Sequence, residues 1–217
     1  MAQVADFQRY VLPFIANAPL PAVDDAVVDA CVDFCTRTRV LRTIMAPVAL
    51  VPGPGEYELD APDGDNVIVS VTSCWLPQGK VFSKTRRELD DQFPNGWANL
   101  ETSDTRSVWG FHCRLPGFLR LVPKLSVKVS RAMTLEVAYA PSRTATEVDD
   151  VLFQLYAEVI AAGALSRLHK HPDAIYADPS RVAAYTEEFE QAIASCGDDS
   201  AHGFAYQPMR TGRDEFQ

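Results

Sequence analysis

The sequence lacks the motifs with which many enzymes activate a nucleophile or hold phosphate, nucleotide or metal groups. It contains no G-x-S-x-G, no G-x4-G-K-[ST], no G-x-G-x-x-G and no H-E-x-x-H. The turn Pro52-Gly53-Pro54-Gly55 resembles a glycine-rich phosphate loop, but its two prolines remove N–H groups that a phosphate would need. We therefore expect a protein that is not an enzyme, with no catalytic residues and no cofactor.

The sequence also lacks an excess of basic residues and long apolar runs. Its 217 residues include 20 Lys and Arg against 29 Asp and Glu, a net charge of −9, whereas groove-reading nucleic-acid binding proteins carry clustered positive charge. The uncharged apolar runs are shorter than the ~18–20 residues of a membrane span, and the N-terminus has no basic-then-apolar signal pattern. We expect a soluble protein with no membrane contact.

The sequence contains few cysteines, and their number is odd. The five cysteines have irregular spacings and mostly apolar neighbours, which is typical of buried free thiols. Cys31 and Cys35 are four residues apart, and His169 and His171 lie within one later segment. A zinc site, and with it a small metal-dependent hydrolase, is therefore an alternative. We favour buried thiols and a helix-end role for the histidines, because zinc ligands usually include a closer pair such as C-x2-C.

The acidic residues are concentrated in one segment of the chain. Residues 141–202 carry eleven acidic and four basic side chains, whereas residues 1–46, 47–140 and 203–217 are each nearly neutral. Such a run is most often a solvated helix face. The functional interpretation is a surface that repels a polyanion.

Helical periodicity marks both ends of the chain. Thr144 and Glu147 have the spacing of a capping box, which predicts the start of a helix there. Asp178-Pro179 predicts the start of the next helix, and Gly197 predicts its end. Pro47 predicts the end of an earlier helix, the second in the chain. The predicted helices cover residues 5–16, 22–46, 144–171 and 179–197.

Short alternating segments with frequent turn residues fill the middle of the chain and predict an antiparallel sheet or sandwich. Pro77-Gln78-Gly79 and Leu115-Pro116-Gly117 predict hairpins, and residues 90–100 an exposed loop. A modest basic patch in this region is interpreted as a solvated loop, with contact to a partner protein or to passing phosphates as the minority alternative; it consists of Lys80, Lys84, Arg86 and Arg87.

These patterns predict an α+β protein. We expect the N- and C-terminal helices, residues 1–46 and 141–199, to form one helical bundle, because neither half is large enough to make a good core alone. An antiparallel β domain, residues 47–140, is inserted between them. Residues 200–217 lack an apolar period and are expected to form an extended tail.

Several residue groups carry a resemblance to a known family. They are Phe7-x2-Tyr10-x2-Pro13, then Ala26 through Ala30-x3-Phe34-Cys35-x-Arg37-Thr38, then Tyr156-x3-Ile160-Ala161-x-Gly163-Ala164-Leu165-x-Arg167-Leu168, followed by Ala177-Asp178-Pro179, Tyr185 and Phe189. In this order and spacing they resemble the head-to-tail adaptor proteins of tailed bacteriophages, also called connector or neck proteins. The resemblance covers both helical regions and the start of the β block.

The resemblance implies a structural virion protein that is assembled in the host cytoplasm and located in the neck. Members of this family form a ring, typically of twelve subunits, beneath the portal protein after genome packaging. The ring gives the tail or nozzle protein its docking surface and lets genomic double-stranded DNA pass without specific binding. The alternative within the virion is a tail-completion or stopper protein that does not touch the portal directly.

Two sets of residues follow as candidate sites. The resemblance implies that the C-terminal tail is an arm that docks on the portal, or else on a neighbouring subunit. Isolated aromatic residues suit that role, because a segment that orders on binding gains energy from a few apolar anchors; the arm residues are Phe204, Tyr206, Met209, Arg210 and Phe216. Acidic side chains lining the channel would keep DNA from sticking; the candidates are Asp149, Asp150, Glu158, Glu187, Glu188 and Glu190.

Overall fold

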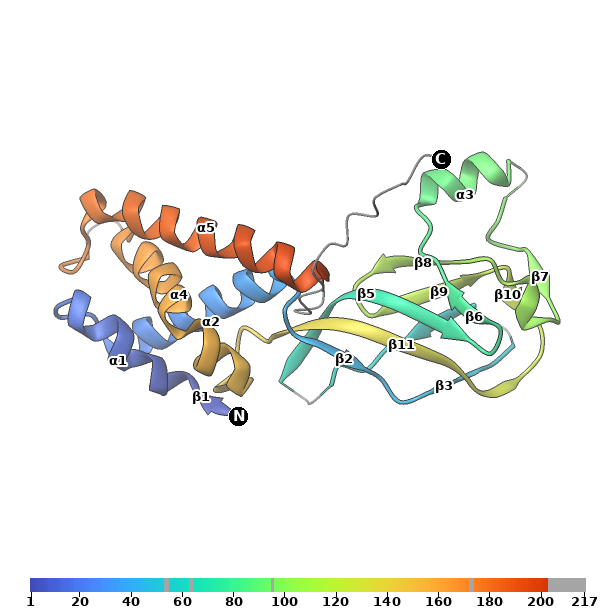
Figure 1. Ribbon diagram of the computed structural model, residues 1–217, viewed down its shortest axis with the longest axis horizontal. Helices are drawn as coiled ribbons and strands as arrows, with labels where there is room; N and C mark the ends of the chain where they lie inside the picture. The colour runs from blue at the N-terminus through green and yellow to red at the C-terminus, as the bar shows by residue number, and fades with distance from the viewer. Residues whose placement is uncertain (53–54, 63–64, 95, 172–173, 203–217) are drawn as a thin grey trace, which may run out of the picture.

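The computed structural model describes residues 1–52, 55–62, 65–94, 96–171 and 174–202. These residues form helices and mostly antiparallel sheets, so the predicted α+β class is confirmed. Figure 1 shows an elongated molecule with the long helices at one end and the sheets at the other. We refer to α1, α2, α4 and α5 as the helical part and to the strands from β2 to β11, with α3, as the β part.

The chain begins with short turns and then one long helix. Strand β1 (Ala2–Gln3) leads into the 3-10 turn η1 (Val4–Phe7), helix α1 (Gln8–Val11) and the 3-10 turn η2 (Leu12–Phe14). The predicted continuous α-helix over residues 5–16 is therefore wrong, because only Gln8–Val11 is α-helical and Ile15 is extended. Helix α2 spans Leu20–Thr38. Its predicted extension to Pro47 is wrong, because Arg39 adopts a left-handed conformation, φ 53°, with its N–H bonded to the Cys35 carbonyl at 2.9 Å.

The C-terminal helices are α4 (Asp150–His169) and α5 (Pro179–His202). Asp149 caps α4 by accepting the Val151 N–H at 3.0 Å. The predicted start at Thr144 and Glu147 is wrong, because Glu147 belongs to β12 (Glu147–Val148), which pairs with β1.

The predicted start of α5 is confirmed and its predicted end is wrong. The Asp178 carboxylate accepts the Ser180 N–H at 3.1 Å, and Pro179 is the first helical residue. Helix α5 continues past Gly197 to His202, so residues 200–202 of the predicted tail are helical. A single glycine costs a helix only about 1 kcal/mol, which the packing of α5 can offset.

The helical part has a core built from both ends of the chain. Helix α4 packs between α2 and α5 (Figure 1). Phe34 of α2 lies against Tyr156 of α4 and Phe189 of α5, with ring centroids 4.9 and 6.4 Å apart. Phe7 packs edge-on against Phe153 at 5.1 Å. Segments more than 100 residues apart in sequence therefore share one apolar cluster.

Helix α4 is long and apolar enough to cross a membrane by length and composition, which the sequence analysis did not anticipate. More than half of its apolar window is buried inside the protein. The core helix of a helical bundle has the same composition, and its position between α2 and α5 accounts for the apolar character of α4.

The β part contains two main sheets. In the first, β11 (Val129–Pro141) pairs antiparallel with β2 (Arg42–Ile44), β3 (Val48–Leu50) and β5 (Asn66–Leu76), and β5 pairs with β6 (Gly79–Val81). In the second, β9 (Phe118–Val122) pairs with β4 (Glu56–Glu58) and β8 (Gly110–Leu115). The smaller elements are β7 (Glu101–Thr102), η3 (Thr105–Ser107) and β10 (Lys124–Leu125).

Both predicted hairpins are confirmed. Leu76 pairs with Gly79 across the β5–β6 turn, and Leu115 pairs with Phe118 across the β8–β9 turn. Gly117 has φ 81°, which a residue with a side chain adopts only with strain. The sheets enclose an apolar cluster separate from that of the helices, with Leu119, Leu135 and Met133 fully buried in it.

The predicted loop over residues 90–100 is partly wrong. Its first residues belong to α3 (Arg86–Gln92), which begins with a capping box: Thr85 Oγ1 accepts the Glu88 N–H at 3.2 Å, and Glu88 accepts the Thr85 N–H at 2.7 Å. Leu89 anchors α3 because its side chain is fully buried.

Candidate interaction surfaces

Two of the candidate acidic residues lie at the N-terminus of α4. Asp149 accepts the Tyr139 hydroxyl at 3.0 Å in addition to capping the helix. Asp150 accepts a hydrogen bond from the N-terminal ammonium of Met1 at 2.9 Å, and this bond raises the pKa of the ammonium. Both carboxylates therefore already have hydrogen-bond partners. Their negative charges also interact favourably with the positive end of the α4 dipole.

Glu190 on α5 forms an ion pair with α2. Its two carboxylate oxygens accept both terminal nitrogens of Arg37, at 2.7 and 2.5 Å. The hydrogen bonds to Arg37 lower the pKa of Glu190 below its ordinary value. This bidentate pair links residues 153 positions apart in sequence and joins the first and last long helices.

Glu158 and Glu188 come together at a groove on the outside of the helical part. The groove has a volume of about 420 Å³, lies over α4 and is bordered by α5 and the N-terminal turns. Small and apolar residues of α4 form its floor, namely Ala161, Ala162 and Leu165. Arg9 lies at the same groove, where its guanidinium stacks over the ring of Phe153 at 4.8 Å.

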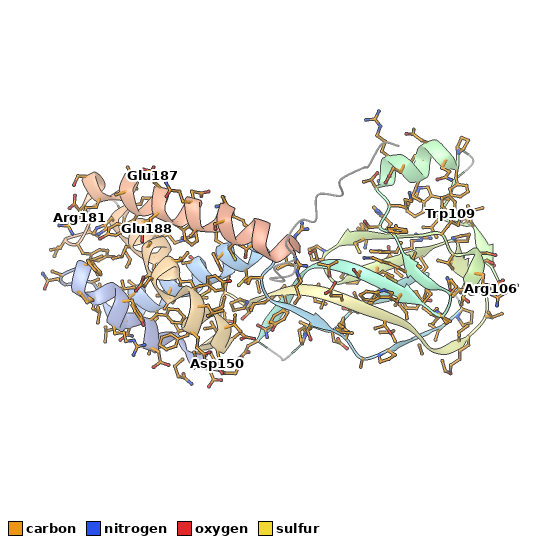
Figure 2. The ribbon with its side chains drawn as sticks, in the orientation of Figure 1. Arg106, Trp109, Asp150, Arg181, Glu187 and Glu188 are labelled. Carbon is orange, nitrogen blue, oxygen red and sulfur yellow. The ribbon has the colours of Figure 1, made fainter. Side chains whose placement is uncertain are left out.

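The six acidic candidates do not gather at one point. Figure 2 shows Asp150 at the edge of the helical part opposite Glu187. Glu187 is exposed and accepts the Gln191 amide one turn away at 3.2 Å. The structure therefore brings together Glu158 of α4 and Glu188 of α5, with Glu187 next to Glu188 in sequence. It engages Asp149, Asp150 and Glu190 in caps and ion pairs.

Large apolar side chains are exposed on the helical part. Leu155 of α4 is 70% exposed, and Phe14 and Leu20 are about half exposed. Leu155 and Glu158 are three residues apart and Glu158 and Ala162 four, so on a helix they follow one stripe toward the groove. Exposed apolar side chains that gather in a patch mark interaction surfaces in many proteins.

The residues of the metal alternative do not form a metal site. Cys31 and Cys35 are buried in the helical core, and desolvation raises the pKa of Cys31 to about 12 and that of Cys35 well above its ordinary value. His169 is buried with Nδ1 3.2 Å from the Tyr176 carbonyl, whereas His171 is exposed. Across the described ranges, no group of three or more His, Cys, Asp or Glu side chains could hold a metal ion.

In the basic patch of the β part, Arg86 and Arg87 belong to α3, Lys84 precedes it and Lys80 lies on β6. Lys84 lies 3.9 Å from Glu88, and Arg86 lies 3.7 Å from Asp90, distances typical of weak exposed ion pairs. Arg87 and Lys80 are exposed. Sequence reasoning placed this patch but missed the groove behind it, which has a volume of about 470 Å³ and lies between β5 and β8. No local pattern encodes that groove, because strands 40 residues apart form its walls.

The arm residues Phe204, Tyr206, Met209, Arg210 and Phe216 lie outside the described residues. Helix α5 ends at His202, immediately before this segment.

Comparison with known proteins decides the family. The profile described as SU10 adaptor protein matches residues 2–212, nearly the whole chain. The chain belongs to this family. It is therefore an adaptor of the head-to-tail type found in phages, which confirms the resemblance seen in the sequence. The match spans both the helical part and the β part of the adaptor, whereas the sequence resemblance rested on the helices and the start of the β block. No curated protein matches the adaptor in sequence.

Proposed function

We propose that this adaptor is a structural virion protein whose copies, typically twelve, form a ring beneath the portal protein and connect the capsid to the tail. The family match carries the proposal, since it covers residues 2–212. The helical part would form the ring wall, and the tail or nozzle protein would dock below it. We place the assembled ring in the neck of the virion, with assembly in the host cytoplasm.

The exposed apolar residues of the helical part support an assembly. Leu155 of α4 and Leu20 of α2 are large apolar side chains exposed to solvent, which a neighbouring copy would cover in a ring. Covering such side chains on ring formation would contribute about 1.5–3 kcal/mol for each large apolar side chain that becomes fully buried.

The charge distribution supports a channel for DNA. The helical segment 141–202 carries most of the net negative charge, and Glu158, Glu187 and Glu188 are exposed on α4 and α5. We propose that these residues face the passing duplex. Asp149, Asp150 and Glu190 complete the proposed lining, and the N-terminal ammonium and Arg37 offset the charge of the last two. Each Lys or Arg bound to phosphate would add salt-dependent affinity, so an acidic lining keeps DNA mobile during ejection.

Mixing the purified adaptor with its portal protein and imaging the product by negative-stain electron microscopy tests the ring. We expect rings on the portal in the mixture, and mass photometry should show one discrete mass increase. An adaptor that stays monomeric in the presence of the portal, with no complex, would contradict the proposal. The adaptor by itself is not a sufficient test, because a partner surface can be needed to drive oligomerisation.

The arm is tested with the same mixture. Removing residues 203–217 should weaken portal docking and leave the circular dichroism spectrum of the helices unchanged. The stopper alternative is separated by chemical crosslinking of assembled necks: crosslinks between adaptor and portal support direct contact, and crosslinks to another neck protein in their place support the stopper.

A further inference from the structure

Two strand edges face each other across an open seam in the β part. β5 pairs with β11 from residue 66 to 75, but with β6 only from Cys74 to Leu76. The chain then leaves β6 and joins β8 at a bridge between Ser83 and Phe111. Within the described part of the chain, residues 67–72 of β5 and 112–114 of β8 therefore each have one edge without a strand partner.

The groove of about 470 Å³ occupies this seam. Val69, Val71 and Phe111 give it apolar walls, and Pro116 lies at its rim near the β8–β9 turn. The Ser70 hydroxyl is buried there without a hydrogen-bond partner among the described residues. Unpaired strand edges present N–H and C=O groups to which another strand can bond. The groove therefore suits an extended segment with apolar side chains at alternate positions.

Positive charge surrounds the groove. Lys84, Arg86 and Arg114 line it. Their carboxylate partners lie at 3.9, 3.7 and 3.8 Å, beyond ordinary hydrogen-bond length. These cations therefore keep hydrogen-bonding capacity for a further carboxylate, which favours an occupant with acidic residues.

We propose that the C-terminal segment of the same chain, residues 203–217, docks in this groove as an added strand. Helix α5 runs from the outer end of the helical part toward the β part and ends, at His202, at the junction between the two (Figure 1). Val69 of the groove packs against the same apolar cluster that contains Cys196 of α5. Fifteen residues span up to about 50 Å when extended, enough to pass along the groove.

The sequence of the segment matches the groove. Phe204 and Tyr206 alternate, so in a strand both side chains face the same side. Pro208 lacks an N–H and sets the end of the paired stretch. Asp214 and Glu215 supply carboxylates for the basic rim.

Docking would hold the arm on its own subunit until a portal competes for it. This inference does not rest on the ring, because it concerns the adaptor alone. If the segment does not dock in the groove, the proposed ring function is unaffected. If the adaptor does not bind the portal, docking of the segment in the groove is unaffected.

Hydrogen–deuterium exchange of the purified adaptor tests the docking. Removing residues 203–217 should make the amides of residues 67–72 and 112–114 exchange about tenfold faster or more, because their added hydrogen bonds are lost. The double change Phe204→Ser and Tyr206→Ser should act in the same way, whereas Phe216→Ser, outside the paired stretch, should not. Exchange in β9 is the internal reference. Equal exchange in all forms would overturn the proposal.

A disulfide test reports which chain fills the groove. Cys113 lines the groove and is half buried. In Tyr206→Cys protein, which keeps Phe204 as an anchor and has the introduced thiol on the groove side of the strand, mild oxidation with copper phenanthroline should join Cys113 to the introduced thiol within one chain, as shown by peptide mass mapping; Cys113→Ser removes the product. Disulfide-linked dimers would assign the groove to the segment of a neighbouring copy, and no disulfide would count against docking; either result overturns the proposal.

Discussion

Gly163 of α4 lies so close to Phe189 of α5 that a Cβ on the glycine would come within 2.7 Å of ring carbon Cε2. The ring is buried, and the Arg167 guanidinium stacks over it at 5.5 Å. Arg167 in turn donates to Asp33 of α2 at 2.7 Å. The ring therefore has little room to move, and the close approach of α4 and α5 depends on the missing side chain.

Gly163→Ala should destabilise the adaptor despite the better helix propensity of alanine. We expect a loss of about 1–3 kcal/mol from overpacking, reduced by about 0.5–1 kcal/mol of propensity. Urea unfolding followed by far-UV circular dichroism measures the difference. The control is Gly197→Ala on α5, where a Cβ would meet nothing within 4 Å; it should leave stability unchanged or raise it. Equal effects of the two changes would argue against the packing explanation.

The two apolar clusters should respond to separate core substitutions. Phe34 is fully buried in the helical cluster and Leu119 in that of the β part. Phe34→Ala and Leu119→Ala should each cost about 2–5 kcal/mol in the free energy of unfolding. This comparison tests our division of the chain into a helical unit, residues 1–46 with 141–199, and an inserted β unit, residues 47–140.

Two probes distinguish the units. All three tryptophans, Trp75, Trp97 and Trp109, lie in the β part, and Figure 2 shows Trp109 below α3. Tryptophan fluorescence should therefore report unfolding of the β unit, and far-UV circular dichroism should report mainly unfolding of the helices. Phe34→Ala should shift mainly the circular dichroism transition to lower urea, and Leu119→Ala mainly the fluorescence transition. Coincident transitions in both variants would show that the chain unfolds as a single unit.

The Arg37–Glu190 pair should stabilise the fold in a pH-dependent way. Arg37 lowers the pKa of Glu190 in the folded state, so the contribution is fully present above the ordinary pKa of 4.5 and is lost as the pH falls through the lowered value. Glu190→Gln should lower the melting temperature at pH 7 and approach the unsubstituted protein in strong acid, with a smaller effect at high salt because the pair is exposed. Glu187→Gln, on the same helix but without an arginine partner among the described residues, is the control. A melting-temperature difference that does not change with pH would contradict the ion-pair explanation.

The cysteine thiols should react slowly in the native adaptor. Burial raises the pKa of Cys31 and Cys74 to about 12 and that of Cys113 to about 11, so little thiolate is present at pH 8. Ellman's reagent should modify Cys113 first, because it is only half buried, and all five cysteines after unfolding in guanidinium. Fast native modification of Cys31 or Cys35, or zinc retained in the purified protein, would revive the metal alternative.

Two capping-box signatures with the same spacing have different outcomes in the structure, and the helix prediction from sequence used only the first. Thr144 and Glu147 have the required spacing, but Glu147 forms a strand with the N-terminus and accepts the Gln3 amide at 2.6 Å. Thr85 and Glu88 have the same spacing and do form the box. The difference is a strand partner 144 residues away, which a local pattern cannot contain.

The sequence by itself determined the α+β class, the arrangement of a β block between helical ends, both hairpins and the family resemblance, because periodicity, turn residues and motif spacing are local properties of the chain. Only the tertiary structure decided which carboxylates are exposed and which bind Arg37, Tyr139 or the N-terminus, and it alone revealed the groove between β5 and β8. These features arise where segments far apart in sequence meet, and their positions depend on how helices and strands pack.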